Sequence, residues 1–288
     1  MALRLKISLL AGFAAACAST GAFAAESGHA EIERQEWPFA GFRGQFDKAQ
    51  LQRGFLVYKE VCSTCHGLKR IYFRNLVQPG GPEFSEESVK ALAEAWPNQI
   101  TDGPDDEGKM FERPAKLSDP IRGPYHNDKE ARANQNGALP PDLSLIVKAR
   151  SVERSSSWFV QPFLMLGDIF KGYQEGGADY LHALLTGYTD PPEGVTVSDG
   201  MYYNKAFPGH QLAMPPPLTD ERLTDKDGYK LPPTVENYTR DVTAFLAWAA
   251  DPTLDQRKRI GWSVMLYLLV TTVLLYLGKK RIWAAIKH

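Results

Sequence analysis

The sequence predicts a mainly α-helical fold with long irregular loops and a single transmembrane helix near the C-terminus. Three observations support this fold class. Apolar residues recur at helical spacing in two segments, residues 260–277 form an uncharged run, and turn-forming Pro and Gly residues fill much of the remainder. No run of alternating strand residues is convincing. We therefore expect irregular segments that wrap around something other than a large apolar core.

The first predicted helix begins after Asp47, whose carboxylate can accept hydrogen bonds from the amides of the first turn. Gly54 lies in the middle of this helix, where glycine costs up to about 1 kcal/mol. Close approach of another helix would explain its presence. The helix runs directly into the segment Cys62–His66. Its apolar residues at helical spacing are Leu51, Phe55, Tyr58 and Val61.

A second helix is predicted over residues 235–250 and ends before Pro252. Its aromatic face is the candidate partner for the glycine of the first helix. A third, short helix is predicted over residues 179–186, closed by Gly187. The apolar face of the second helix consists of Val242, Phe245, Leu246 and Trp248.

Residues 1–24 have the pattern of a cleaved secretory signal peptide. The basic residues Arg4 and Lys6 precede an apolar stretch at 7–16 that is too short to span a bilayer, and an Ala-x-Ala cleavage signal follows at 22–24. We therefore expect an exported domain that begins at residue 25.

Cys17 would be removed with the signal peptide. A lipid-modified Cys17 is the less favoured alternative, because Ala14 rather than leucine stands three positions before it.

The uncharged run at residues 260–277 covers roughly 27 Å as a helix, enough for one membrane crossing. Basic residues flank both of its ends in nearly equal number, so the positive-inside rule hardly distinguishes the two orientations of the helix. The export signal decides the orientation. It predicts a periplasmic domain at residues 25–256, and an anchor at 257–288 that ends in a short cytoplasmic tail at the inner membrane of a bacterium.

The net charge of −1 hides an asymmetry. All 34 acidic residues lie between the signal peptide and the anchor, whereas nine of the 33 basic residues lie outside that region. The exported domain therefore has 24 basic residues against 34 acidic ones, a net charge of −10. Such a domain is expected to attract a basic partner and to repel nucleic acid.

The motif Cys62-Ser-Thr-Cys65-His66 indicates one covalently bound heme c. Two thiols at this spacing can form thioethers with the two heme vinyl groups, while the adjacent imidazole of His66 reaches the iron as an axial ligand. A zinc site would need further cysteines, and a thioredoxin-like site would need a helix that starts at the motif rather than one that runs into it. The predicted fold is accordingly that of a c-type cytochrome.

Sequence spacing alone does not decide which residue is the sixth ligand of the iron. Met214 is the preferred ligand because three prolines follow it and restrict the backbone that carries the thioether. A closed His/Met site raises the reduction potential and leaves no position for a substrate, which favours electron transfer over peroxidase chemistry. The other candidates are Met110, Met165, Met201, His182 and His210.

Several ordered motifs make the chain resemble cytochrome c1, the heme subunit of the ubiquinol:cytochrome c reductase (cytochrome bc1) complex, in its bacterial form. The resemblance covers nearly the whole mature chain. The motifs are Gly54–Tyr58 leading into Cys62–His66, Asn136–Ser144, Ile146–Arg150, Tyr180, Leu184–Tyr188, Met201–Asn204, Ala213–Leu218 and Phe245–Pro252.

The resemblance implies that Met214 is the sixth iron ligand and that Arg150 and Tyr180 lie near a heme propionate. It also implies that Asn136, Pro140 and Pro141 belong to a loop packed against the ring. The stretch 151–177 is longer than in shorter family members, which leaves its path open.

The resemblance further implies a function and partners. The subunit would take an electron from the Rieske iron-sulfur protein and reduce a soluble, basic cytochrome c, within a dimeric, quinol-oxidising and proton-translocating complex that serves a respiratory or photosynthetic chain. It would not be an enzyme on its own. Its anchor would contact membrane lipid and pack beside cytochrome b.

A ring of carboxylates around the heme edge would steer the basic carrier. The candidate carboxylates are Glu83, Glu86, Glu87, Asp102, Asp105, Asp106 and Glu107.

Alternative functions come from two classes. Within the first, a membrane-anchored c-type cytochrome of a terminal oxidase or nitric oxide reductase is the nearest rival, but it is not expected to carry the Pro140-Pro141 loop together with this C-terminal helix and anchor. The second is a thiol-disulfide oxidoreductase that uses Cys62 and Cys65 without heme.

Overall fold

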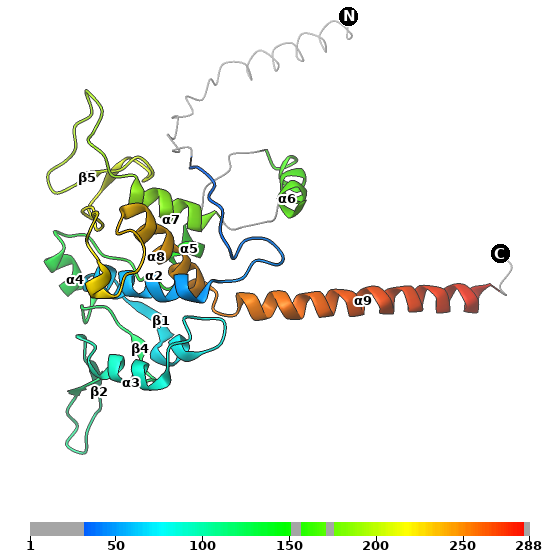
Figure 1. Cartoon of the computed structure of the whole chain (residues 1–288), viewed down its shortest axis with the longest axis horizontal. Helices are drawn as coiled ribbons and strands as arrows, with labels where there is room; N and C mark the ends of the chain where they lie inside the picture. The colour runs from blue at the N-terminus through cyan, green and yellow to red at the C-terminus, as the bar shows by residue number, and fades with distance from the viewer. Residues whose placement is uncertain (1–31, 151–156, 171–175, 285–288) are drawn as a thin grey trace, which may run out of the picture.

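The computed structural model describes residues 32–150, 157–170 and 176–284. The predicted signal peptide at 1–24 and the last four residues of the tail lie outside this part of the chain. The described chain forms a helical body from which one long helix, α9 (Leu254–Trp283), projects (Figure 1). The mainly helical prediction is confirmed.

Helices α2 (Lys48–Glu60) and α8 (Val235–Ala250) form the centre of the body. Asp47 is the N-cap of α2, and its side chain accepts the amide of Gln50, as predicted. Helix α8 has the predicted bounds, and its N-cap Thr234 accepts the amide of Asn237.

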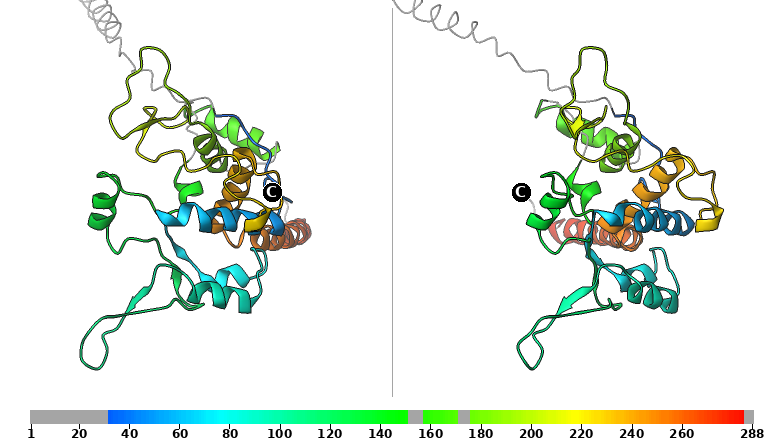
Figure 2. Two further views of the ribbon diagram at one scale, coloured as in Figure 1. Left: turned by 60° about the vertical axis from the view of Figure 1, so that its left-hand side comes forward. Right: turned by 90° about the vertical axis from the view of Figure 1, so that its left-hand side faces the viewer.

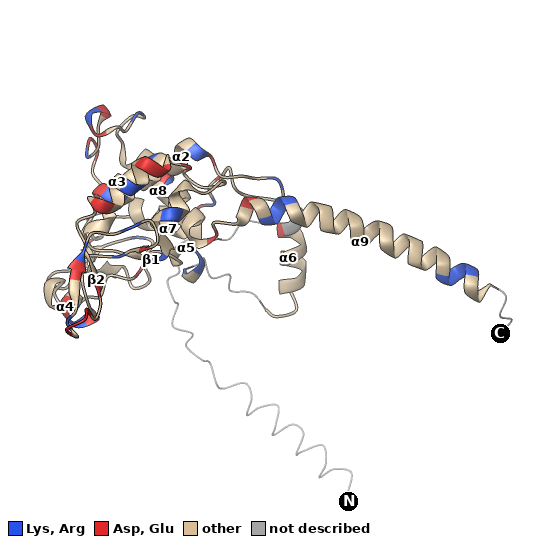
Figure 3. Ribbon diagram, turned by 90° about the horizontal axis from the view of Figure 1, so that it is seen from below, with Lys and Arg blue, Asp and Glu red and all other residues tan. Residues whose placement is uncertain are grey.

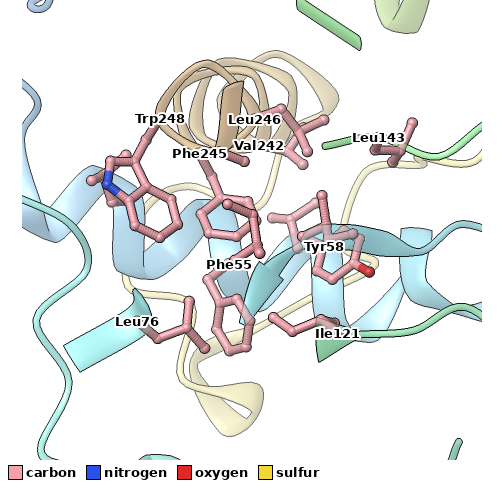
Figure 4. Packing of buried hydrophobic residues seen from close by; sticks show 14 of the residues in the cluster. Phe55, Tyr58, Leu76, Ile121, Leu143, Val242, Phe245, Leu246 and Trp248 are labelled. Atoms are coloured by element: carbon pink, nitrogen blue, oxygen red, sulfur yellow. The ribbon is translucent and has the colours of Figure 1, made fainter. Parts of the chain in front are cut away.

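The predicted close approach at Gly54 is confirmed. A Cβ atom at this position would lie 2.0 Å from the carbonyl oxygen of Asp241 in α8, so only glycine lets the two backbones meet. The aromatic rings of Phe55 and Tyr58 lie 5.5 and 5.8 Å from the ring of Phe245 between centroids. Figure 4 shows Phe245 of α8 close to Phe55 and Tyr58 of α2.

A buried ion pair lies beside this contact. The guanidinium of Arg53 donates to both carboxylate oxygens of Asp241, at 2.8 and 3.1 Å, and the hydroxyl of Tyr229 donates to the same carboxylate at 2.8 Å. Because Asp241 is buried, these three donated bonds offset the loss of its hydration.

The apolar core is larger than the sequence led us to expect. It joins α2 and α8 to side chains from the short segments around them, including Leu68, Phe73 and Ile121. These short segments each contribute one or two buried residues, too few to produce a periodic signal.

The described strands are two to five residues long and form three two-stranded antiparallel sheets, in which β1 pairs with β4, β2 with β3, and β5 with β6. Strands of this length cannot show an alternating pattern. The hairpin of β2 and β3 and the loop between α7 (Gly177–Thr186) and β5 project from opposite sides of the body (Figure 2). The strands are β1 (Leu68–Tyr72), β2 (Ile100–Asp102), β3 (Phe111–Arg113), β4 (Pro120–Ile121), β5 (Tyr202–Tyr203) and β6 (Gln211–Leu212).

Helix α7 (Gly177–Thr186) matches the predicted third helix and ends at Gly187, as expected. It packs against α8 and against the short helix α5. The remaining helical segments, which the sequence patterns did not predict, are η1 (Cys62–Thr64), η2 (Phe73–Val77), α3 (Glu86–Glu94), α4 (Asp128–Asn134), α5 (Ile146–Ala149), α6 (Gln161–Phe170) and η3 (Asp225–Asp227).

Helix α9 is the one described helix that is long and apolar enough to cross a membrane, and its apolar side chains are exposed. It begins at Leu254, three residues before the expected start of the anchor. Its first turns pack on the body: Lys258 donates to the carbonyls of Phe39 and Gly44 at 2.6 and 3.0 Å, and Asp255 accepts the amide of Phe46. These bonds tie the membrane helix to the body.

Replacing Gly54 with alanine is expected to lower the free energy of unfolding by about 1–3 kcal/mol, because the added methyl group collides with the backbone of α8. Urea unfolding followed by circular dichroism measures this change. Gly167 of α6 has open space around it, so Gly167→Ala is the matched control and should leave stability unchanged or slightly raised. Equal stability of the two variants would contradict the tight α2–α8 contact.

Candidate heme-attachment site

The last turn of α2 delivers the Cys-x-x-Cys-His segment. After α2, Cys62–Thr64 form η1, and the amides of Cys65 and His66 both donate to the carbonyl of Cys62, at 3.1 and 2.9 Å. The hydroxyl of Tyr58 donates to the carbonyl of His66 at 3.1 Å. Because α2 is held by the core, the two thiols and the imidazole extend from a fixed backbone.

His66 is oriented by one hydrogen bond. Its Nδ1 atom lies 2.7 Å from the carbonyl oxygen of Pro141. A carbonyl can only accept, so Nδ1 carries the proton and the neutral ring keeps its lone pair on Nε2. Burial lowers the pKa of His66 and so favours this neutral form. A neutral imidazole fixed through its other nitrogen is the form that ligates iron.

The loop that carries Pro141 is held against β1. The Asp142 carboxylate accepts the amides of Lys69 at 2.8 Å and Ser144 at 3.0 Å. The amide of Leu143 donates to the carbonyl of Gly67 at 2.9 Å. These bonds fix the carbonyl that orients His66.

Upstream of this loop, Asn136 is exposed and adopts a positive φ of 48°, followed by Gly137 at 85°. These two residues reverse the chain after α4. Pro140 is half-buried and Pro141 is exposed. Within the loop that sequence analysis named, Pro141 is therefore hydrogen-bonded to His66, whereas Asn136 lies in the turn after α4.

The two cysteines are half-buried and are not joined by a disulfide. Burial raises the pKa of the Cys62 thiol to about 12. A thiol-disulfide catalyst needs a lowered thiol pKa, so the environment of Cys62 does not favour the thioredoxin-like alternative. The side chain of Gln135 lies 3.6 Å from the sulfur of Cys65, and its Nε2 also lies 2.6 Å from the hydroxyl of Tyr125.

Met214 lies in a segment tied to the end of α7. Its carbonyl accepts a hydrogen bond from the hydroxyl of Tyr188 at 3.1 Å. The buried Asn204 donates to the carbonyl of Leu184 at 2.8 Å and bridges to Tyr188, which joins the β5–β6 hairpin to α7. Burial raises the pKa of Tyr188, so its hydroxyl stays protonated and able to donate.

The competing ligands are exposed or engaged elsewhere. His182 is buried, and its Nε2 lies 3.0 Å from the carboxylate of Glu236. The ring of His210 stacks on Tyr203 with centroids 5.6 Å apart, and its Nδ1 lies 3.2 Å from the carbonyl of Asn204. Met110, Met165 and Met201 are exposed, whereas Met214 is half-buried.

Arg150 and Tyr180 come together through the contact of α5 with α7. A Cβ atom on Gly177 would lie 1.6 Å from the carbonyl oxygen of Val147 and 2.4 Å from that of Arg150, so the start of α7 rests on the end of α5. Burial raises the pKa of Tyr180, and the charge of Arg150 opposes this rise. Arg150 itself is exposed and Tyr180 is buried.

Sequence reasoning missed four residues that support the site. Asp142 and Tyr188 lie inside motifs that were recognised, but only the folded chain shows which backbone groups they bond. Gln135 and Tyr125 stand in segments without any pattern. Their contact with each other and with Cys65 arises from tertiary structure alone.

Two cavities of the described chain lie away from this site. One, of about 210 Å³, lies where the first turns of α9 meet Phe39, Phe46 and Val147. The other, of about 550 Å³, lies between α2 and α3. Neither is lined by Cys62, Cys65, His66 or Met214.

The Cytochrome C1 family profile matches residues 37–286. The chain belongs to the cytochrome c1 family. "Cytochrome c1" of Blastochloris viridis is 47% identical over 99% of this chain and 97% of its own length. "Cytochrome c1, heme protein, mitochondrial" of Schizosaccharomyces pombe is 42% identical over 88% of this chain and 73% of its own length.

A third relative, "Cytochrome b/c1" of Bradyrhizobium diazoefficiens, is 49% identical over 86% of this chain. The chain spans only 35% of that relative's length. As a member of the cytochrome c1 family, the chain is a heme subunit of the cytochrome bc1 complex with one covalently bound heme c. The neutral His66 beside the two unpaired thiols fits such a group.

Replacing Asp142 with alanine is expected to raise the midpoint potential of the heme. Without this carboxylate the Pro141 carbonyl would be held less firmly, and His66 as the expected axial ligand would be a weaker donor, which would favour the reduced iron. A redox titration followed by absorbance measures the potential.

The matched control is Asp105→Ala. Asp105 also accepts two backbone amides, those of Glu107 and Lys109, but it does so in the β2–β3 hairpin. Its variant should keep the wild-type potential. Identical potentials in all three proteins would show that the Asp142 bonds do not orient His66.

Proposed function

We propose that this chain relays single electrons from the Rieske iron-sulfur protein to a soluble cytochrome c within a cytochrome bc1 complex. The observation that carries the proposal is the placement of His66, in the tautomer that ligates iron, beside two unpaired thiols at the end of α2. Bound heme would supply one-electron redox chemistry. The protein supplies attachment, axial ligation and an electrostatic surface, and it acts as an electron-transfer subunit rather than as an enzyme on its own.

The proposed heme contacts are those of the sequence motifs. Cys62 and Cys65 would attach the heme covalently, with His66 and Met214 as the axial ligands. The half-burial of Met214, its bond to Tyr188 and the three prolines after it support this choice. Arg150 and Tyr180 would serve a propionate, supported by the contact of α5 with α7. Asn136, Pro140 and Pro141 would shape the loop beside the ring.

The proposed topology places residues 25–256 in the periplasm and the tail of the anchor in the cytoplasm of a bacterium. The cleavage signal at residues 22–24 and the apolar surface of α9 support it. Cytochrome b would pack beside α9 within a dimeric complex, a proposal supported by the relative named "Cytochrome b/c1".

Acidic residues, interspersed with basic ones, lie in α3, the β2–β3 hairpin and α4, at the end of the domain away from α9 (Figure 3). Three of the seven carboxylates named by sequence analysis form ion pairs: Glu83 with Lys48 at 3.2 Å, Asp102 with Arg113 at 2.6 Å and Glu107 with Lys109 at 3.0 Å. The other named carboxylates include Glu86 and Glu87, in the first turn of α3. This end is the proposed docking region for a basic cytochrome c.

Replacing Met214 with leucine is expected to lower the midpoint potential of the heme by on the order of 0.1 V or more, because a thioether ligand favours the reduced iron. Redox titration of the purified protein measures the shift. Met201 lies in the same region but is exposed, so Met201→Leu is the control and should retain the wild-type potential. An unchanged potential in the Met214 variant would exclude it as the axial ligand.

Electron transfer to a basic cytochrome c is expected to slow steeply as ionic strength rises, because salt screens the attraction of the acidic end of the domain. Stopped-flow oxidation of the reduced protein at increasing salt measures the rate. A cytochrome c with acetylated lysines is the control, and its slower reaction should depend little on salt. Salt-independent rates with the unmodified carrier would rule out electrostatic steering.

A further inference from the structure

Helix α6 and the turn before it, residues 157–166, expose several large apolar side chains. Trp158 is 84% exposed and Phe163 is 74% exposed. Between residues 157 and 167 the sequence has no charged residue. A contiguous apolar surface of this kind marks a contact with a partner or a membrane. The other exposed apolar residues of the segment are Phe159, Met165 and Leu166.

The length of α6 restricts what the helix can do. Its ten residues cover roughly 15 Å, about half the thickness of the hydrocarbon core of a bilayer. It therefore cannot cross a membrane. A short helix that is apolar around most of its circumference, but not buried in its own protein, is typical of an interfacial segment.

The position of α6 relative to α9 indicates what its apolar surface contacts. Figures 1 and 3 show α6 outside the body, at the level of the first turns of α9 along the axis of α9, with its own axis crosswise to it. These turns hold the basic residues Arg257, Lys258 and Arg259, after which the apolar run begins at Ile260. A helix at this level and in this orientation would lie flat at the surface of the bilayer that α9 crosses.

We propose that residues 157–166 form a second membrane contact, with the exposed side chains of Trp158, Phe163 and Leu166 inserted among the lipids at the periplasmic interface. Tryptophan and phenylalanine suit this depth, where an apolar body meets hydrated headgroups. With α9, this segment holds the heme domain at two points and restricts its tilt on the membrane. The inference goes beyond the electron relay and depends only on α9 as the anchor.

Spin-label accessibility tests this contact in the full-length, heme-loaded protein in phospholipid vesicles. The chain has three cysteines: Cys17 belongs to the predicted signal peptide, and Cys62 and Cys65 would be thioether-linked to heme, so a new cysteine can be labelled alone. Phe163→Cys and Leu166→Cys report on α6. The ratio of oxygen to water-soluble nickel collisions rises with depth in the bilayer.

Two labelled positions calibrate the measurement. Val264→Cys lies in the apolar run of α9 and should give a high ratio, which also verifies that the anchor is inserted. Val195 is exposed and belongs to the loop between α7 and β5, a loop that lies on the side of the body away from α9 (Figure 1), so Val195→Cys should give a low ratio. An unchanged heme spectrum shows that each labelled protein is folded.

We expect ratios at positions 163 and 166 that exceed the ratio at 195 several-fold. Ratios equal to that at 195 would place α6 in water and overturn the proposal. Low collision rates with both oxygen and nickel would show that another protein surface covers α6, and would equally overturn it. Because the heme relay is measured separately, either outcome leaves the proposed function unaffected.

Discussion

The approach of α2 to α8 at Gly54 is the constraint on which the rest of the molecule depends. The missing side chain lets the helix backbones touch, and the phenylalanine rings of Phe55 and Phe245 close the contact on one side. On the other side, Arg53 and Tyr229 satisfy the buried carboxylate of Asp241. One helix of this pair ends in the heme-attachment motif, and the other leads through three residues into α9. The same contact therefore relates the site to the membrane anchor.

The site is assembled by backbone groups from segments far apart in the sequence. The Pro141 carbonyl decides which nitrogen of His66 keeps its lone pair, and Asp142 fixes the loop that presents that carbonyl. Tyr188 holds the carbonyl of Met214 in a similar way. Such orientation by surrounding groups would suit His66 and Met214 as the proposed axial ligands, because little conformational freedom would remain to be lost when a metal binds.

The described domain divides its surface between two environments. Exposed apolar residues of α6 and α9 lie at one end, and acidic residues of α3, α4 and the β2–β3 hairpin, interspersed with basic ones, lie at the other (Figure 3). An apolar surface is stabilised by contact with lipid, whereas an acidic surface attracts a basic carrier from solution. With α9 in a membrane, separation of the two would leave the acidic end accessible to the proposed carrier.

The sequence by itself determined the motif Cys62–His66, the bounds of α8, the cap of α2 and the apolar run of α9, because each depends on neighbouring residues in the chain. The tertiary structure alone decided which carbonyl orients His66, which residues close the core, and where Gln135 and Tyr188 act. Each of these contacts joins two residues that lie between 26 and 75 positions apart in the sequence, in short segments without a periodic pattern. Their positions follow from packing on α2, α7 and α8, which no local pattern encodes.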